Sequence, residues 1–297
     1  MVNQKTSAFI IATVSFISWG AFVMYWHALT SINALEVIAH RAVWSLIFSA
    51  VLIIILRKGL EVKYVLSNPK YILPLVCSSL LIASNWFVFI WAVGHERIVE
   101  ASMGSYIVPL MNVVISALVF KIWLNRYQFV AITFAFIGVS YMIYVYGRLP
   151  YVTILFAVTF CLYGIIKKFV PTGAIVGLFI ETIVISIPAL IYIIYTLIDG
   201  TSVLYRNDMG INLLLIFSGV ITTPPLMGFS YSAKILHLST IGILQYLTPT
   251  IAFLLGIFLY NEYFSRSLLI AFLFIWTGLL IYTLDGFRQL HNNRINR

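Results

Sequence analysis

Two stretches of the sequence, 140 positions apart, decide the fold: YIVPLMNVVISALVFKIWLNRYQFVAITFAFIG at 106–138 and YLTPTIAFLLGIFLYNEYFSRSLLIAFLFIWTG at 246–278. Aligned without a gap, they match Tyr106 with Tyr246, Pro109 with Pro249, Arg126 with Arg266, Ala131 with Ala271, Phe134 with Phe274 and Gly138 with Gly278. Each stretch is an apolar run, a polar spacer and a second apolar run. The sequence therefore predicts an internal repeat of paired apolar helices.

The composition of the whole chain agrees with a membrane location. Of its 297 residues 62% are hydrophobic and 9% charged, whereas a soluble domain needs a surface that is about a quarter charged. Ten apolar runs lie near 6–26, 36–56, 71–93, 98–120, 127–146, 149–166, 174–197, 210–231, 238–260 and 266–285. Most approach the ~20 residues that a helix needs to cross a bilayer, and the alternation typical of a barrel is absent. We expect an all-α integral membrane protein with ten transmembrane helices.

The repeat divides these helices into two groups of five. The first helix of each group matches at a shift of 144, where Trp19 and Gly20 meet Tyr163 and Gly164. Because five is odd, the second group enters the membrane with the opposite orientation, as in many secondary transporters. We expect two inverted five-helix halves, 1–147 and 148–297.

The basic residues set the orientation. With a cytoplasmic N-terminus, thirteen Lys and Arg residues fall on the cytoplasmic side, four on the opposite side, and Arg41 lies inside a helix. The positive-inside rule then predicts that both termini are cytoplasmic. The net charge of +9 is not gathered in a basic stripe with interleaved aromatics, so no nucleic-acid partner is expected.

Ionisable residues within the apolar runs are candidates for a site, because such groups are costly in a membrane and usually face a cavity or a partner. His40 and Arg41 lie in the second run, and the 140 shift places Arg41 opposite Glu181 in the seventh. Arg41 either pairs with Glu181, binds an anionic group of a solute, or only locks helices together. If Glu181 titrates, it offers a route to proton coupling.

Matched prolines give a second indication of a central site. Pro109 and Pro249 fall near the middle of the fourth and ninth runs, where proline bends or breaks a helix and exposes backbone groups to a cavity. The alternative is that prolines are simply common in membrane helices. Gln245 lies one turn before Pro249, so its amide is expected near the bend.

The remaining candidates are amide and aromatic side chains. Asn85 is able to hydrogen-bond across helices or to a solute. Aromatic side chains in membrane proteins divide between interfacial belts and cavity walls. The residues expected to line the cavity are Trp19, Trp86, Tyr106, Tyr163 and Tyr246.

Enzyme classes find no support in the sequence. It contains no P-loop, no GxGxxG, no HExxH and no GxSxG pattern, and its five histidines are scattered. We therefore expect no catalytic residues, no metal, no cofactor and no ATP-driven step.

The residues together resemble a known family, the EamA branch of the drug/metabolite transporter superfamily, in its RarD-like group. The likeness covers nearly the whole chain and is most specific in the last third, at Ser239, Thr240, Gly242, Gln245, Tyr246, Pro249, Thr250, Tyr260, Glu262, Phe274, Ile275, Trp276, Tyr282, Leu284 and Asp285. The resemblance implies a ten-helix protein of the bacterial inner membrane with a central cavity between its halves. It does not imply a particular solute.

Two functions from different classes follow. The first is a secondary transporter, permease or exporter, that moves a small metabolite or drug by alternating access. The second is a non-transporting polytopic membrane protein, such as a receptor or assembly factor, in which the polar residues only hold helices together. The sequence leaves the oligomeric state and the direction of transport open.

Overall fold

The computed structural model describes residues 2–295 except 122–123, 148, 168–169, 171, 207, 234 and 237–243, and these residues contain helices but no β-strand. The longer helices are α1 (Val2–His27), α2 (Ala34–Ile55), α4 (Pro69–Gly94), α5 (Ile98–Phe120), α6 (Arg126–Tyr146), α7 (Tyr151–Lys167), α8 (Ala174–Ile198), α9 (Met209–Ala233) and α12 (Arg266–Ile295). The shorter elements are α3 (Gly59–Leu66), the 3-10 helix η1 (Val203–Arg206), α11 (Leu247–Leu254) and its π-helical continuation η2 (Leu255–Leu259).

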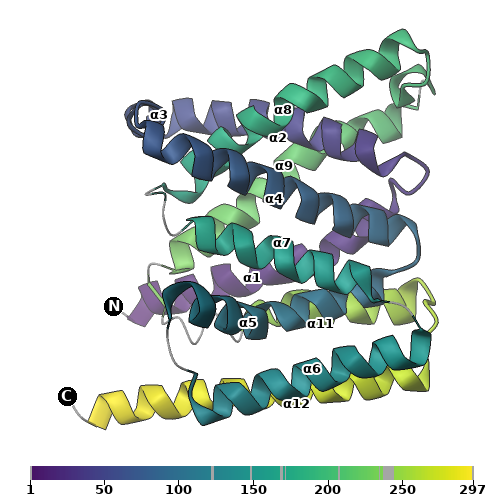
Figure 1. Ribbon diagram of the computed structural model, residues 1–297. Coiled ribbons are helices and arrows are strands. Elements are labelled where there is room, and N and C mark those ends of the chain that lie inside the picture. The colour runs from purple at the N-terminus through teal and green to yellow at the C-terminus, as the bar shows by residue number, and fades with distance from the viewer. Residues whose placement is uncertain are drawn as a thin grey trace.

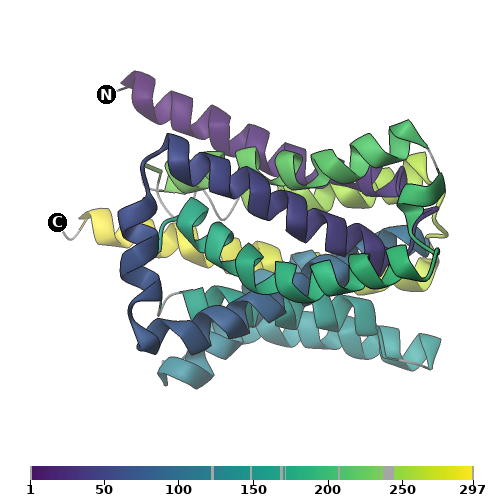
Figure 2. The same ribbon diagram turned by 90° about the horizontal axis from the view of Figure 1, so that it is seen from above.

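The long helices lie roughly side by side in one bundle. In Figure 1, α2 and α8 form one edge, α6 and α12 form the opposite edge, and α1, α4, α5, α7, α9 and α11 lie between them. Both marked chain ends lie at the same end of the bundle (Figure 1). Figure 2 shows the short helix α3 running across that same end.

Seven of the described helices are long and apolar enough to cross a membrane: α1, α2, α4, α6, α8, α9 and α12. Three further apolar helices are shorter in their described parts: Ile98–Met111, Tyr151–Lys167 and Leu247–Leu259. The apolar runs predicted most helix starts well, since hydropathy marks where the chain enters an apolar region.

The largest difference between prediction and structure is in the ninth run. It was expected to be one helix over 238–260, but a turn at Tyr246 separates the helical residues Leu244 and Gln245 from α11, which begins at Leu247. Ser239, Thr240 and Gly242 lie outside the described residues. A second difference is α3, which lies in what was expected to be a loop. Its eight residues are too few for helical periodicity to stand out in the sequence.

Local capping groups explain where α6 and α12 begin. The Asn125 side chain accepts a hydrogen bond from Gln128 N while the Gln128 side chain accepts one from Asn125 N, which forms a capping box at the start of α6. The Ser265 hydroxyl accepts from Leu268 N at the start of α12. Asn125 and Ser265 are 140 positions apart, so both helices begin at the same point of the repeat.

Helices α6 and α12 contact each other through reciprocal small residues. A Cβ placed on Gly138 would lie 2.9 Å from the carbonyl oxygen of Ala271, and one placed on Gly278 would lie 2.6 Å from that of Ala131. Small residues allow such close approach of membrane helices. The 140-residue shift aligns Gly138 with Gly278 and Ala131 with Ala271, so it converts each of these contacts into the other.

Other repeat-equivalent residues also meet or share a conformation. The rings of Phe134 and Phe274 lie 6.2 Å apart, and those of Tyr106 and Tyr246 lie 6.3 Å apart and nearly parallel. Lys121, which follows α5, has a φ angle of 53°, and Asn261, which comes after η2, has a φ angle of 52°. These contacts and backbone angles thus involve residues that the 140-residue shift aligns.

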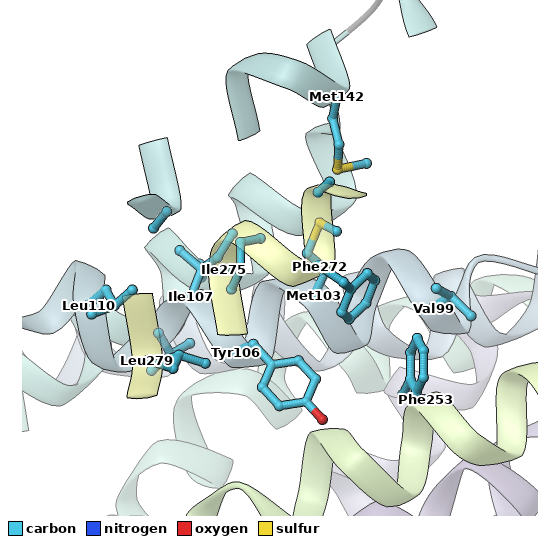
Figure 3. Close-up of a cluster of buried hydrophobic side chains, with 14 of the residues drawn as sticks. Val99, Met103, Tyr106, Ile107, Leu110, Met142, Phe253, Phe272, Ile275 and Leu279 are labelled. Carbon is cyan, nitrogen blue, oxygen red and sulfur yellow. The ribbon is translucent and has the colours of Figure 1, made fainter. Parts of the chain in front are cut away.

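A large cluster of buried apolar side chains joins α5 to α6, α7, α11 and α12 (Figure 3). Phe272 and Met103 are fully buried within it. Figure 3 shows the Tyr106 ring against this cluster, with its hydroxyl pointing away from Met142. The Tyr106 hydroxyl, a polar group of α5, therefore points from the cluster toward the middle of the bundle.

Candidate functional site

Glu181 is the centre of a buried polar cluster that three helices build. It lies two turns into α8 and is 1% exposed. Its carboxylate accepts hydrogen bonds from Ser78 Oγ of α4 at 3.1 Å and from Tyr163 Oη of α7 at 3.3 Å. The Lys167 ammonium at the end of α7 pairs with it at 2.9 Å. A buried carboxylate is stable only with partners of this kind.

Gly177, one turn before Glu181 on α8, makes room for the lysine of this pair. A Cβ placed on it would lie 2.3 Å from Lys167 Nζ. Any side chain at this position would displace the ammonium group. The small residue on α8 and the lysine on α7 thus act together to bring the positive charge to Glu181.

Arg41 is buried without a carboxylate partner. Its side chain is 7% exposed, and its guanidinium carbon lies 3.8 Å from the centre of the Trp86 ring and 4.9 Å from that of Trp26. No ion pair within the described part of the chain includes Arg41. Its repeat-equivalent residue, Glu181, pairs with Lys167 instead. The cation therefore depends on the faces of two aromatic rings, which attract it through their quadrupoles.

His40 precedes Arg41 on α2 and is also buried, at 5% exposed. Its Nε2 atom has no hydrogen-bond partner among the described residues. One turn earlier, Glu36 accepts hydrogen bonds from Ser202 Oγ at 3.2 Å and from Val203 N at 2.7 Å. Glu36 thus anchors the segment that follows α8, while His40 has an unused polar atom.

Tyr106 and Tyr246 lie at the contact between α5 and α11. The Thr250 hydroxyl donates to Tyr246 O at 2.7 Å, which leaves its oxygen to accept from Tyr106 Oη, also at 2.7 Å. The Tyr106 ring meets the edge of Trp276 at 6.0 Å. A single hydroxyl on α11 thus connects the repeat-equivalent tyrosines.

Asn85 holds two helices together. Its side-chain amide donates to Phe156 O at 2.9 Å and to Thr159 Oγ1 at 3.1 Å, both on α7. The side chain is 4% exposed, so these bonds use the donors of a buried group. Of the two roles open to Asn85, the structure supports the contact between α4 and α7.

The remaining predicted residues have less specific surroundings. Trp19 packs edge-on against Phe16 at 5.5 Å, close to the start of α11. Gln245 is half-buried just before α11. Helix α5 continues without interruption through Pro109, whereas Pro249 is the third residue of α11. A turn at Tyr246 interrupts the ninth run just before Pro249, whereas α5 has no such interruption at Pro109. The structure thus shows a break at one of the two matched prolines.

Three residues of the Glu181 cluster and its surroundings were missed by sequence reasoning. Lys167 was counted only as a charge on the cytoplasmic side, and Ser78 and Gly177 were not considered. A flexible lysine at the end of an apolar helix is able to reach back along that helix. The position of Lys167 at the end of an apolar run, next in sequence to the run that forms α8, was therefore the available signal. Nothing local to Ser78 marks it as a partner of a residue 103 positions away.

A second polar group lies at the end of the bundle opposite the chain termini. The Glu262 carboxylate accepts from Ile98 N at 2.5 Å and Val99 N at 2.8 Å, and so caps α5. Burial raises the pKa of Glu262 above its usual range, the two N–H donors lower it, and nearby Glu96 and Glu100 raise it further.

A cavity of about 280 Å³ opens beside Glu262. It is lined by His95, Glu96, Arg97, Val99, Glu100, Met142, Leu149, Pro150, Glu262, Tyr263 and Leu268. None of the residues predicted from the sequence lines it.

Comparison with known proteins identifies the family. Residues 5–144 match the EamA-like transporter family. The chain is 41% identical over 287 residues to the uncharacterized transporter YojE of Bacillus subtilis, covering 95% of this chain and 96% of YojE. It is 35% identical over 284 residues to protein RarD of Escherichia coli, covering 96% of each chain.

A solved crystal structure shares the fold, with a TM-score of 0.59 and 19% identity over 94% of this chain and 98% of that one. The expected resemblance is thus confirmed at the level of sequence. The chain belongs to the EamA-like transporter family, among relatives of RarD, and is a multi-pass membrane protein.

Proposed function

We propose that this protein is a secondary transporter that moves a small metabolite or drug across the bacterial cell membrane by alternating access. Two inverted five-helix halves, 1–147 and 148–297, would rock against each other around a central site. Both termini would be cytoplasmic. The transport would require no catalytic residue and no cofactor.

The reciprocal contacts between repeat-equivalent residues support the inverted halves. A residue that touches its own equivalent lies on or near a two-fold axis, since only there does the rotation bring the two together. Tyr106 with Tyr246 and Phe134 with Phe274 meet in this way. An axis through both contacts agrees with an arrangement in which one half is the inverted copy of the other.

The positions of charges support the orientation. Helix α3, with Lys58 before it and Lys63 within it, runs across the end of the bundle at which both chain ends lie (Figure 2). The cavity at the opposite end is lined by three glutamates and a single arginine, Arg97. Positive charge is enriched on the cytoplasmic side of membrane proteins, which agrees with cytoplasmic termini.

The observation that carries the proposal is the pair of buried charges at repeat-equivalent positions, Arg41 and Glu181. The two residues do not form an ion pair with each other. Glu181 pairs with the Lys167 ammonium, and Arg41 lies between tryptophan rings. Ionisable groups kept inside an apolar bundle at such cost are typical of a transport pathway. The Ser78 contact of Glu181 also joins the first half to the second.

Glu181 is the candidate for proton coupling within this proposal. Its carboxylate holds a lysine of α7 and a serine of α4 at once. Loss of the Glu181 charge would end the ion pair with Lys167, which lies in the same half, and would weaken the hydrogen bond from Ser78, which joins the two halves. A titrating group that changes a contact between moving parts is able to couple proton binding to their motion.

The test is solute uptake into proteoliposomes that contain the purified protein, with a panel of anionic, neutral and cationic metabolites. Each solute is measured with and without imposed proton and sodium gradients. We expect saturable flux of at least one solute, lost in Glu181→Gln and retained in the control Lys58→Met. Absence of flux for every solute, with folded protein in the vesicles, would contradict transport and favour a receptor or assembly factor.

A further inference from the structure

Buried polar atoms without partners concentrate on two helices that pack along each other, α2 and α8. Five buried side-chain atoms lack a hydrogen-bond partner among the described residues, and four of them are His40 Nε2, Arg41 Nε, Ser45 Oγ and Ser186 Oγ. Most buried polar groups in proteins are hydrogen-bonded, so an unsatisfied one requires an explanation. Three of the four lie within two turns of α2, so this part of α2 carries polar atoms whose hydrogen-bonding capacity the described residues do not satisfy.

Arg41 is the most costly of these groups because it is charged. The carboxylate of Glu36, five positions earlier on α2, is already held by Ser202 and Val203. That of Glu181 is held by Lys167. A buried cation without a counter-ion is strongly unfavourable in an apolar interior. Stacking on Trp86 and Trp26 offsets this cost only in part.

A second arginine of the chain, Arg97, has both aromatic neighbours and a carboxylate partner. Arg97 also stacks on aromatic rings, with its guanidinium carbon 5.1 Å from the Tyr151 ring and 5.7 Å from the Trp91 ring. Unlike Arg41, it pairs with a carboxylate, that of Glu100 at 3.3 Å. The environment of Arg41 thus has the aromatic walls of the Arg97 environment without the carboxylate.

We propose that Arg41 binds the carboxylate of the transported solute, and that this solute is a monovalent organic acid with an aromatic or other apolar body. The inference rests on the proposed transport function and names its substrate class. The guanidinium supplies charge-assisted N–H donors to the carboxylate. The rings of Trp86 and Trp26 supply an apolar surface beside it.

Charge balance selects a monovalent acid. One carboxylate neutralises one guanidinium, and neither Glu36 nor Glu181 forms an ion pair with Arg41 within the described part of the chain. A divalent anion such as a phosphate monoester would leave excess negative charge in a region of low dielectric constant, which is unfavourable. A neutral amide of the same shape lacks the charge that Arg41 requires.

The test compares carboxylates with amides of the same skeleton: benzoate with benzamide, and 2-naphthoate with 2-naphthamide. The protein is held in phosphatidylcholine nanodiscs, so that no anionic lipid headgroup competes, and binding is titrated by tryptophan fluorescence and by calorimetry. We expect saturable binding of the carboxylates. Each amide should bind at least about tenfold more weakly than the carboxylate of the same skeleton. Equal affinity for acid and amide would overturn the proposal.

Variants separate a binding role from a structural one. Arg41→Gln should weaken carboxylate binding by about tenfold or more, while the control Arg97→Gln should leave it unchanged. Without ligand, Arg41→Gln should unfold at the same temperature as the wild type or higher, because it removes a buried charge without a counter-ion. If Arg41→Gln is unstable but Arg41→Lys folds and binds both members of each pair equally, Arg41 is structural and the proposal fails.

The outcome is distinguishable from that of the transport proposal. Flux confined to neutral or cationic solutes would overturn the carboxylate assignment and leave transport standing. Carboxylate binding that depends on Arg41, without flux of any solute, would contradict transport and leave the anion site standing.

Discussion

Removal of Lys167 should destabilise the protein more than removal of its partner charge at Glu181. The two side chains differ in their access to water: that of Lys167 is 21% exposed and that of Glu181 is 2% exposed. In Lys167→Met the carboxylate stays in place with only the hydroxyl donors of Ser78 and Tyr163. In Glu181→Gln the lysine stays, at the end of α7, and its chain is long enough to extend toward water.

The magnitudes follow from this asymmetry. At 2.9 Å and an effective dielectric constant of about 20, the attraction is about 6 kcal/mol before desolvation is subtracted. Breaking a buried pair by removing one partner typically costs about 3–5 kcal/mol, which we expect for Lys167→Met. For Glu181→Gln we expect about 1–2 kcal/mol, the loss of a charge-assisted hydrogen bond. The double variant should cost no more than Glu181→Gln, so the coupling energy should equal the cost of Lys167→Met, about 3–5 kcal/mol.

The assay is reversible unfolding in mixed micelles with an increasing fraction of sodium dodecyl sulfate, followed by tryptophan fluorescence. Lys58→Met is the matched control, because it breaks the Lys58–Glu61 pair, whose side chains are 50% and 29% exposed. An exposed pair contributes no more than about 1 kcal/mol. The reasoning is refuted if Lys167→Met costs no more than the control, or if Glu181→Gln costs more than Lys167→Met.

Three further outcomes are expected. Gly138→Ala and Gly278→Ala should each cost about 1–3 kcal/mol in the same unfolding assay, because an added Cβ meets a backbone carbonyl at 2.9 and 2.6 Å. Gly164→Ala is the control, since a Cβ there would have nothing within 4 Å, and it should be neutral or slightly stabilising. A destabilising effect of Gly164→Ala would contradict this packing argument. Asn85→Ala should lower the yield of folded protein, measured by size-exclusion chromatography, without changing carboxylate affinity, and a selective loss of affinity would instead place it in the site. Because the pKa of Glu262 is raised by burial in the folded state, protonation favours folding: its contribution is present below its ordinary pKa of 4.5 and is lost as pH rises through the raised value. Unfolding temperatures between pH 4 and 8 should therefore fall more steeply with pH in the wild type than in Glu262→Gln, and parallel curves would refute this.

The architecture was largely predictable because hydropathy and the internal repeat are properties of short stretches. The starts of α6 and α12, at Arg126 and Arg266, follow from apolar runs with capping residues before them. The 140-residue register aligned Gly138 with Gly278, but only the structure shows that each of these glycines lies against the other helix. Helix α3 was not predictable, since eight residues do not establish a period.

The candidate site was only partly predictable. The burial of Arg41 and Glu181 follows from charges placed inside apolar runs. Their partners do not, because a lysine at one helix end, a serine on another helix and two tryptophan rings come together only when α1, α4, α7 and α8 pack. The matched prolines differ in the structure, since α5 continues through Pro109 while a turn at Tyr246 interrupts the ninth run just before Pro249.

The sequence by itself determined that the protein is a bundle of apolar helices, that two of its stretches align at a shift of 140 residues, and that two charges of opposite sign lie inside it. Only the tertiary structure decided which charge has a partner. Glu181 lies where Gly177 leaves space for the Lys167 ammonium, and Arg41 lies between two rings that carry no charge. The physical reason is that hydropathy acts on each segment separately, whereas neutralising a buried charge requires a particular atom from another helix within about 3–4 Å.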